Sequence, residues 1–311
     1  MRRRRVSGCV PIVAAAGVPV NRGDPSVVHE PAPRFRPLVS ALVAAASIVT
    51  FVLVLQPPAA RAASDPVRIS GTGSGTGGMI LLAQAYRRVH PGTPVEVMPA
   101  IGSTGGIRAV IDGRLAISVA NRPPSAREAE QAPLASFLYA RTPFVIALSR
   151  QLGITGLTTA QLAAIYDGSS VSFPNGKRAR PLVRLVSSTD MDLLKALASS
   201  MALAVETARK RPGMLDAVTD TEAADILETT PGAIGPSTLA QIESEKRQLV
   251  ALTLDGRAPT LANLANGEYP HHKELHLISQ QNPPVHVQRF IDFVRSDQGR
   301  RILSAAGHAA P

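Results

Sequence analysis

A short β-like run passes directly into a glycine-rich stretch in the sequence VRISGTGSGTGG at residues 67–78. Residues 67–70 predict a strand, and apolar side chains then recur at helical spacing over residues 79–89. A Gly/Ser/Thr stretch at the start of a helix is typical of an anion site, because unpaired backbone N–H groups and the positive end of the helix dipole meet there. The stretch therefore predicts a strand, a loop and a helix that begins at an anion.

The same arrangement recurs twice. A strand over 95–98 precedes the Gly/Ser/Thr stretch 102–106, and a strand over 182–186 precedes Ser187-Ser188-Thr189-Asp190. Further strands are predicted at 115–120 and 143–149, and further helices at 107–111, 157–165, 193–201, 221–227 and 287–305. Short strands that alternate with helices predict an α/β fold with mostly parallel sheets.

Three such helix starts that converge on one point would replace the water around a tetrahedral oxyanion with neutral donors. Each stretch alone also fits an ordinary N-cap, where Ser, Thr and Gly are favoured for local reasons. Arg184, three residues before Ser187, is the candidate for an added cation. The hydroxyl-bearing candidate ligands are Thr72, Ser74, Thr76, Ser103, Thr104, Ser187 and Thr189.

Charge does not favour nucleic acid as a partner, although the formal net charge is +10. Residues 1–62 hold eight of the 33 basic residues and two of the 23 acidic ones, so the remainder carries only +4. The content of 45% hydrophobic and 18% charged residues is that of a globular protein and excludes a disordered chain.

The N-terminal region predicts export from the cytoplasm. Arg34 and Arg36 precede an uncharged apolar run over 38–55, and the small-residue site Ala60-Arg61-Ala62 follows. This order is what a signal peptidase recognises, so we expect cleavage after Ala62 and an extracytoplasmic mature chain. The run approaches the length that spans a bilayer, so an uncleaved membrane anchor is the alternative. No structure is predicted for residues 1–33.

Cys9 is the single cysteine, so no disulfide is expected in the mature chain, and the lack of an apolar stretch before it argues against lipidation. His271, His272 and His276 have a spacing that a metal site would allow. The neighbouring Pro270 favours a surface loop instead, and no metal is predicted.

An enzymatic alternative comes from residues 73–78, which match the dinucleotide fingerprint G-x-G-x-x-G, with Glu96 near the place of the ribose-binding acid. The export signal argues against it, because nicotinamide cofactors belong to the cytoplasm, and a dinucleotide fold needs neither of the other two Gly/Ser/Thr stretches. The sequence also lacks a nucleophile with an adjacent base. We therefore predict a binding protein that is not an enzyme and has no cofactor.

Over most of residues 67–311 the chain resembles the phosphate-binding family of ABC-transporter solute receptors. The segments that match the family in order are Gly71-Thr72-Gly73-Ser74, Gly102-Ser103-Thr104-Gly105-Gly106-Ile107, Ser118-Val119-Ala120-Asn121-Arg122-Pro123, Leu162 to Gly168, Arg184 to Thr189, Gly232-Ala233-Ile234-Gly235, Leu254-Asp255-Gly256-Arg257-Ala258-Pro259-Thr260 and Gly267-Glu268-Tyr269-Pro270.

The resemblance implies a type II periplasmic-binding-protein fold with two lobes, each a mostly parallel sheet flanked by helices, joined by two hinge crossings. The predicted lobes comprise residues 63–142 with 236–311, and residues 143–235, after a leader over 1–62. The ligand is expected in the cleft between them, and closure of the lobes is the signal. Asn121 joins the candidate ligands on the strength of this resemblance.

Two positions depart from the family pattern. The family usually has Asp where this chain has Asn121, and a carboxylate there accepts a hydrogen bond from hydrogen phosphate and so rejects sulfate. Asn121 is able to donate or accept, so this rejection of sulfate is weakened and a different oxyanion becomes an alternative ligand. The family's Ser-Gly-Thr is Ser187-Ser188-Thr189 here, which adds a Cβ close to the ligand.

The sequence thus predicts a monomeric extracytoplasmic receptor that captures an oxyanion, phosphate first, and delivers it to an ABC permease in the inner membrane. The alternatives are a receptor for molybdate, tungstate or sulfate, and a sensory or scaffold protein that keeps the fold without tight binding.

Overall fold

A computed structural model describes residues 65–185 and 188–311. The predicted export signal, Cys9 and Ser187 lie outside the described residues. Within the described part of the chain, no helix combines the length and the apolar character needed to cross a bilayer.

The described chain is a mixed α/β structure, which confirms the predicted fold class. The strands are β1 (Val67–Gly71), β2 (Val95–Val97), β3 (Ile117–Ala120), β4 (Leu134–Ser149), β5 (Gly156–Leu157), β6 (Arg180–Arg184), β7 (Leu215–Ala217), β8 (Ala233–Thr238), β9 (Leu249–Ala251), β10 (Thr253–Leu254) and β11 (His272–Gln280). The helices are α2 (Gly73–Val89), α3 (Gly102–Ile111), α4 (Ala126–Ala129), the 3₁₀ turn η1 (Arg150–Leu152), α5 (Thr159–Asp167), α6 (Thr189–Ala196), α7 (Ser199–Ala208), α8 (Asp220–Thr229), α9 (Leu239–Ser244), α10 (Leu261–Ala265), α11 (Val285–Arg295) and α12 (Asp297–Ser304).

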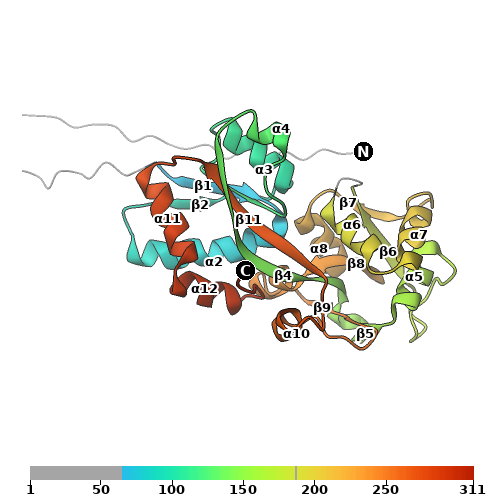
Figure 1. Ribbon diagram of the computed structural model, residues 1–311. Coiled ribbons are helices and arrows are strands. Elements are labelled where there is room, and N and C mark those ends of the chain that lie inside the picture. The colour runs from blue at the N-terminus through green and yellow to red at the C-terminus, as the bar shows by residue number, and fades with distance from the viewer. Residues whose placement is uncertain (1–64, 186–187) are drawn as a thin grey trace, which may run out of the picture. The chain divides into compact units, whose positions relative to one another are not determined.

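One sheet of nine strands runs through the described residues in the order β2-β1-β3-β11-β4-β8-β6-β7, with β9 paired to β4. Its two wings are parallel: β1 pairs in parallel with β2 and β3, and β6 with β7 and β8. The centre is antiparallel, because β11 and β4 run between the wings and pair with each other. Figure 1 shows β4 and β11 passing from the side of α2, α11 and α12 toward the side of α5, α6 and α7.

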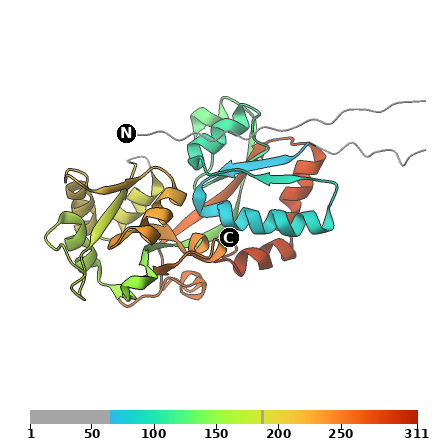
Figure 2. The ribbon, with the colours of Figure 1, turned by 180° about the vertical axis from the view of Figure 1, so that it is seen from behind.

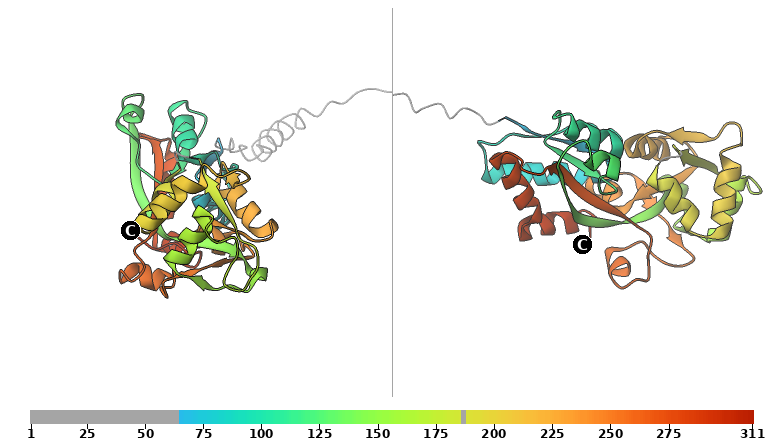
Figure 3. Two further views of the ribbon diagram at one scale, coloured as in Figure 1. Left: turned by 90° about the vertical axis from the view of Figure 1, so that its right-hand side faces the viewer. Right: turned by 45° about the horizontal axis from the view of Figure 1, so that its top comes forward.

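Strand β4 connects the two wings within a single element. Its first part pairs with β11, and the right-hand view of Figure 3 shows the two strands side by side. In its last part, Phe144, Ile146 and Leu148 pack on one face and Val145 and Ala147 on the other, as the two-residue period of a strand requires. Burial of both faces explains why this stretch is continuously apolar in the sequence.

Two large hydrophobic cores form in the described residues. The first core gathers side chains from β1, α2, β3, β11, α11 and α12, with Tyr86 and Phe290 packed edge to face. The second core gathers side chains from the end of β4 and from α5, β6, α6 and α7, together with Leu252 and Leu254. The division into lobes at residues 63–142 with 236–311 and 143–235 stays a prediction.

The glycine-rich stretches differ from the prediction. They are not loops before the helices but the first turns of α2 and α3, which begin at Gly73 and Gly102. Glycine is needed at the entry to α2 because Gly71 has φ +144° and a Cβ there would lie 1.9 Å from the carbonyl oxygen of Val119. Figure 2 shows α2, in cyan, running beside β1 and β2.

The helical region predicted over 287–305 is confirmed and consists of two helices, α11 and α12, which are separated at Ser296, whose hydroxyl caps α12. One smaller prediction was wrong. His272 and His276 lie in strand β11 rather than in a surface loop. No cluster of three or more potential metal ligands occurs among the described residues.

Candidate functional site

A cleft of about 360 Å³ lies where the starts of α2, α3 and α6 approach one another. Its walls come from elements of both cores, since α2 and β3 belong to the first and β6 and α6 to the second. The residues that line it are Thr72, Ile101, Gly102, Ser103, Thr104, Gly105, Asn121, Arg122, Arg184, Leu185, Ser188, Thr189, Asp192, Val218, Thr219 and Asp220.

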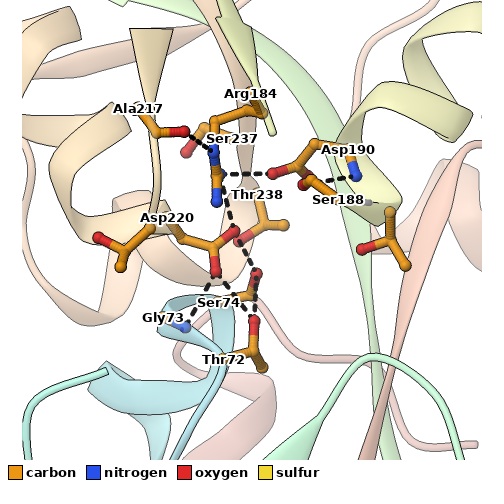
Figure 4. Close-up of polar contacts among 12 residues, drawn as sticks. Thr72, Gly73, Ser74, Arg184, Ser188, Asp190, Ala217, Asp220, Ser237 and Thr238 are labelled. Carbon is orange, nitrogen blue, oxygen red and sulfur yellow. Dashed lines mark hydrogen bonds and ion pairs between the residues drawn. The ribbon is translucent and has the colours of Figure 1, made fainter. Parts of the chain in front are cut away.

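The start of α2 is held by a carboxylate from another part of the chain. Asp220, the first residue of α8, accepts hydrogen bonds from the hydroxyl of Thr72 at 2.9 Å and from the backbone N–H of Gly73 at 3.0 Å. The hydroxyl of Ser74 donates to the same carboxylate at 3.3 Å. Figure 4 shows these three donors pointing at the two oxygens of Asp220.

Four buried charges meet behind this contact. The guanidinium of Arg184 donates to Asp190 at 2.6 Å and to Asp220 at 3.3 Å. The ammonium of Lys273, at the start of β11, pairs with the same two carboxylates, at 3.0 Å from Asp220. We call Arg184, Asp190, Asp220 and Lys273 the charge cluster. Its formal charge sums to zero, and its members are no more than 11% exposed.

Asp220 keeps its negative charge in this setting. Burial disfavours the charged carboxylate, but Lys273 and Arg184 outweigh burial, so the pKa of Asp220 lies well below its ordinary value. The same attraction acts on the partner: burial disfavours the charged ammonium of Lys273, yet Asp190 and Asp220 raise its pKa. Burial raises the pKa of Asp190, while the attraction of Lys273 and Arg184 opposes this shift. The cluster therefore holds a charged Asp220 carboxylate between two cations.

The contacts of Thr72 fix the orientation of the Asn121 amide. Thr72 has one hydroxyl proton, which it gives to Asp220, so its oxygen can only accept from Asn121. The Asn121 NH₂ group accordingly faces Thr72 at 3.0 Å and Thr189 at 3.4 Å. Its carbonyl oxygen Oδ1 is buried and has no hydrogen-bond partner among the described residues.

Four other hydroxyls of the cleft act as acceptors and so keep their own protons. Ser103 accepts from the backbone N–H of Asn121 at 3.0 Å, and Thr104 accepts from Arg122 at 3.1 Å. Ser188 accepts from the N–H of Asp190 at 3.2 Å, and Thr189 accepts from Asn121. A hydroxyl has one proton and two lone pairs, so each of these side chains is able to donate to a further acceptor.

Arg122 is held on this wall by an acidic partner. Its guanidinium forms two bonds to Glu128, at 2.6 and 2.9 Å, and this contact lowers the pKa of Glu128 to about 2. Glu128 also completes the capping box of α4 with Ser125. The bond from Arg122 to Thr104 thus extends from a side chain that is already fixed in place.

The structure brings most of the predicted residues to the cleft. Thr72, Ser103, Thr104, Asn121, Arg184 and Thr189 line it, and Ser74 lies behind Asp220. Thr76 is not among them, because its hydroxyl donates to the carbonyl of Thr72 within α2, at 3.3 Å, and its side chain faces a separate hollow.

Asp220 and Lys273 were missed by the sequence reasoning. A signal existed for Asp220, since it follows a short strand and a Thr N-cap at the start of α8, as α2 follows β1 and Thr72. Lys273 is the second residue of β11, and no local sequence pattern sets it apart.

A second hollow, of about 730 Å³, is lined by Lys177, Arg178, Arg180 and Arg211. The side chains of Lys177 and Arg211 there donate to main-chain carbonyls at the ends of η1 and α5. None of the predicted ligands lies in it, so the cleft at α2, α3 and α6 is the candidate site.

The PBP superfamily domain matches residues 56–298 of this chain. The chain belongs to the PBP superfamily. A curated relative, the phosphate-binding protein PstS of Bacillus subtilis, is 24% identical over 238 residues, which cover 76% of this chain and 77% of the relative. The sequence resemblance to this class of binding proteins is thereby confirmed.

Solved structures of PBP-like proteins agree in fold. A substrate-binding protein of Clostridium perfringens, solved with bound phosphate, has a TM-score of 0.65 at 20% identity and covers 79% of this chain and 100% of its own. The periplasmic molybdate-binding protein of Azotobacter vinelandii has a TM-score of 0.55 at 15% identity, with 79% and 99% covered. At these identities the likeness concerns the fold alone.

Proposed function

We propose that this chain is an extracytoplasmic solute receptor that binds an oxyanion, phosphate first, in the cleft between the starts of α2, α3 and α6. The observation that carries the proposal is the set of four hydroxyls, on Ser103, Thr104, Ser188 and Thr189, that accept bonds from the protein and keep their protons. They come from both sides of the cleft, as a ligand enclosed by two lobes requires.

Backbone donors add to these hydroxyls. The first N–H groups of α3 and α6 have no partner within their own helices, and the positive end of each helix dipole attracts an anion. Such donors replace the hydration of an oxyanion without a full counter-charge. The guanidinium of Arg184 is largely unavailable as a counter-charge for the ligand, because it is paired with Asp190 and Asp220.

Phosphate is favoured over sulfate by the acceptor at Asn121. Its oxygen Oδ1 has no partner in the described part of the chain, so it is able to accept a hydrogen bond from the protonated oxygen that hydrogen phosphate has and sulfate lacks. An amide therefore supplies the acceptor that the family pattern supplies with Asp. The phosphate-binding relative of B. subtilis supports this choice, and the molybdate-binding neighbour is the reason to keep molybdate, tungstate and sulfate as alternatives.

The receptor hands its ligand to an ABC permease and performs no chemistry on it. Residues 63–142 with 236–311 form one lobe and residues 143–235 the other, and the amide nitrogen of Asn121 lies 3.4 Å from the hydroxyl of Thr189 across the cleft. Contacts of this kind between the lobes favour closure to the extent that an open form lacks them. The leader over residues 1–62 directs export, and the mature protein acts as a monomer.

A second candidate is a sensory or scaffold protein that keeps the fold without tight binding. The observation that favours it is the charge cluster, in which both cations are already neutralised and the start of α2 is already occupied by Asp220.

Calorimetric titration of the full chain with phosphate, sulfate and molybdate separates these candidates. Heat that saturates at micromolar phosphate, with weaker or no heat for the other two, is the expected result. Saturation with molybdate or sulfate alone would replace phosphate by that anion. No heat with any of the three would contradict the receptor and favour the scaffold.

A further inference from the structure

The surroundings of the Asp220 carboxylate are those of a bound anion. Its five donors are a backbone N–H at a helix start, two hydroxyls, a guanidinium and an ammonium, all between 2.9 and 3.3 Å from its oxygens. Gly73, whose N–H is one of them, begins α2, and Asp220 lies 147 positions further along the chain. A side chain of the protein thus takes the place at α2 that an external anion would otherwise take.

The donors of the cleft consequently fall into two groups. Thr72 and Ser74 give their protons to Asp220, whereas Ser103, Ser188 and Thr189 accept bonds and keep theirs. The first group is saturated by a carboxylate that the chain carries itself. An oxyanion that enters the cleft meets the second group directly and meets the first only by displacing Asp220.

The charge cluster makes this carboxylate decisive for affinity. With Asp220 present, the formal charges of two cations and two carboxylates cancel. Without it, Arg184 and Lys273 would face Asp190 alone, and the wall of the cleft would carry one positive charge. A buried charge of this kind acts strongly on a neighbouring anion, because little water lies between them to screen it.

We propose that Asp220 is a built-in anion that occupies the α2 side of the cleft and limits the affinity of the site for an external oxyanion. The proposal rests on the proposed function for the identity of the ligand. It makes Asp220 an affinity-determining residue that competes with the ligand for the donors of Thr72, Gly73 and Ser74.

The test compares three variants of the full chain. Asp220→Ala removes the carboxylate, and Asp220→Asn removes its charge while keeping its shape. Asp192→Ala is the matched control, because Asp192 is an exposed carboxylate on the wall of the same cleft and takes no part in the charge cluster. All are titrated with phosphate at constant ionic strength, and their thermal unfolding is followed with and without sodium formate, which supplies a free carboxylate.

We expect Asp220→Ala to bind phosphate roughly tenfold or more tightly than the unmodified chain, because a like charge beside the ligand is removed, and Asp192→Ala to change the affinity several times less. Asp220→Asn should also bind phosphate more tightly than Asp192→Ala, so the comparison can still be made if the alanine variant does not fold. An affinity of the Asp220 variants equal to or below that of the control would overturn the proposal.

If the unmodified chain binds no oxyanion, the proposed function is wrong. The effect of formate on thermal unfolding then still tests whether Asp220 occupies an anion site. A free carboxylate should then raise the unfolding midpoint of Asp220→Ala and not that of Asp192→Ala. Equal shifts of the unfolding midpoint in Asp220→Ala and Asp192→Ala would show that no anion-binding site exists at the start of α2.

Discussion

The carboxylate of Asp220 accepts a hydrogen bond from the hydroxyl of Thr72 at 2.9 Å, across 148 positions of the sequence. Thr72 precedes α2 and Asp220 begins α8, so the bond joins the starts of two helices. Because it uses the single proton of Thr72, it also turns the Asn121 amide so that its oxygen is left to accept. This one contact thereby determines that the Thr72 proton is already used and that the Asn121 oxygen is available to a ligand.

Replacing Thr189 by Val should weaken phosphate binding by about tenfold or more, since a hydroxyl that donates to a charged ligand contributes roughly 1.5–3 kcal/mol. Calorimetric titration gives the affinity. Thr76→Val is the matched control, because Thr76 bonds to its own helix and faces a separate hollow. Equal losses in the two variants would remove Thr189 from the site.

Asn121→Asp should shift the preference between phosphate and sulfate. The new carboxylate would face the hydroxyl oxygen of Thr72, whose proton already goes to Asp220. Two hydrogen-bond acceptors would then face each other without a proton between them. Binding of an unprotonated dianion should suffer most, and we expect the phosphate-to-sulfate affinity ratio to rise by about tenfold. Asn175→Asp, in an exposed turn, adds the same charge elsewhere. An unchanged ratio would contradict the role given to Asn121.

The sequence revealed the strand-and-helix alternation and most of the cleft, because periodicity and helix-start chemistry are local properties. It placed the first turns of α2 and α3 in loops, since glycine usually indicates a loop. Gly71, just before α2, serves a different purpose, because it lets β1 approach the backbone of Val119. Lys273 and Asp220 were missed for a different reason. The helix start at Asp220 can be seen in the sequence, but only the tertiary structure pairs the two charges across 53 positions.

Lys273→Met should destabilise the fold by about 3–5 kcal/mol, because it leaves two buried carboxylates with Arg184 as their only partner in the charge cluster. Urea unfolding measures the loss. Arg68→Met breaks a surface pair with Glu96, whose side chains are 55% and 50% exposed, and should cost less than about 1 kcal/mol. A second change, Asp190→Asn, should recover part of the loss by restoring charge balance. Similar losses for Lys273→Met and Arg68→Met would refute this account of the cluster.

His308 should make stability depend on pH. Burial lowers the pKa of His308 from 6.5 to about 4, and its ring packs against Gly78 of α2. The unfolded chain binds a proton near pH 6.5 and the folded chain only near pH 4. Stability should therefore fall as the pH drops through this interval, by up to about 3 kcal/mol.

Urea unfolding of His308→Leu between pH 7 and pH 4 isolates this contribution. The variant should lose stability less steeply than the unmodified chain, while His90→Leu, at an exposed position, should keep the original slope. Parallel slopes for His308→Leu and the unmodified chain would mean that His308 is not buried as a neutral ring.

The capture of phosphate in the cleft is tested most directly by an NMR titration of the ¹⁵N-labelled full chain with phosphate. The account predicts that the amide signals of residues 102–105 and 188–189 move first, while those of residues 177–180, at the basic hollow, stay in place. Signals that move only at residues 177–180, or at none of these positions, would contradict it.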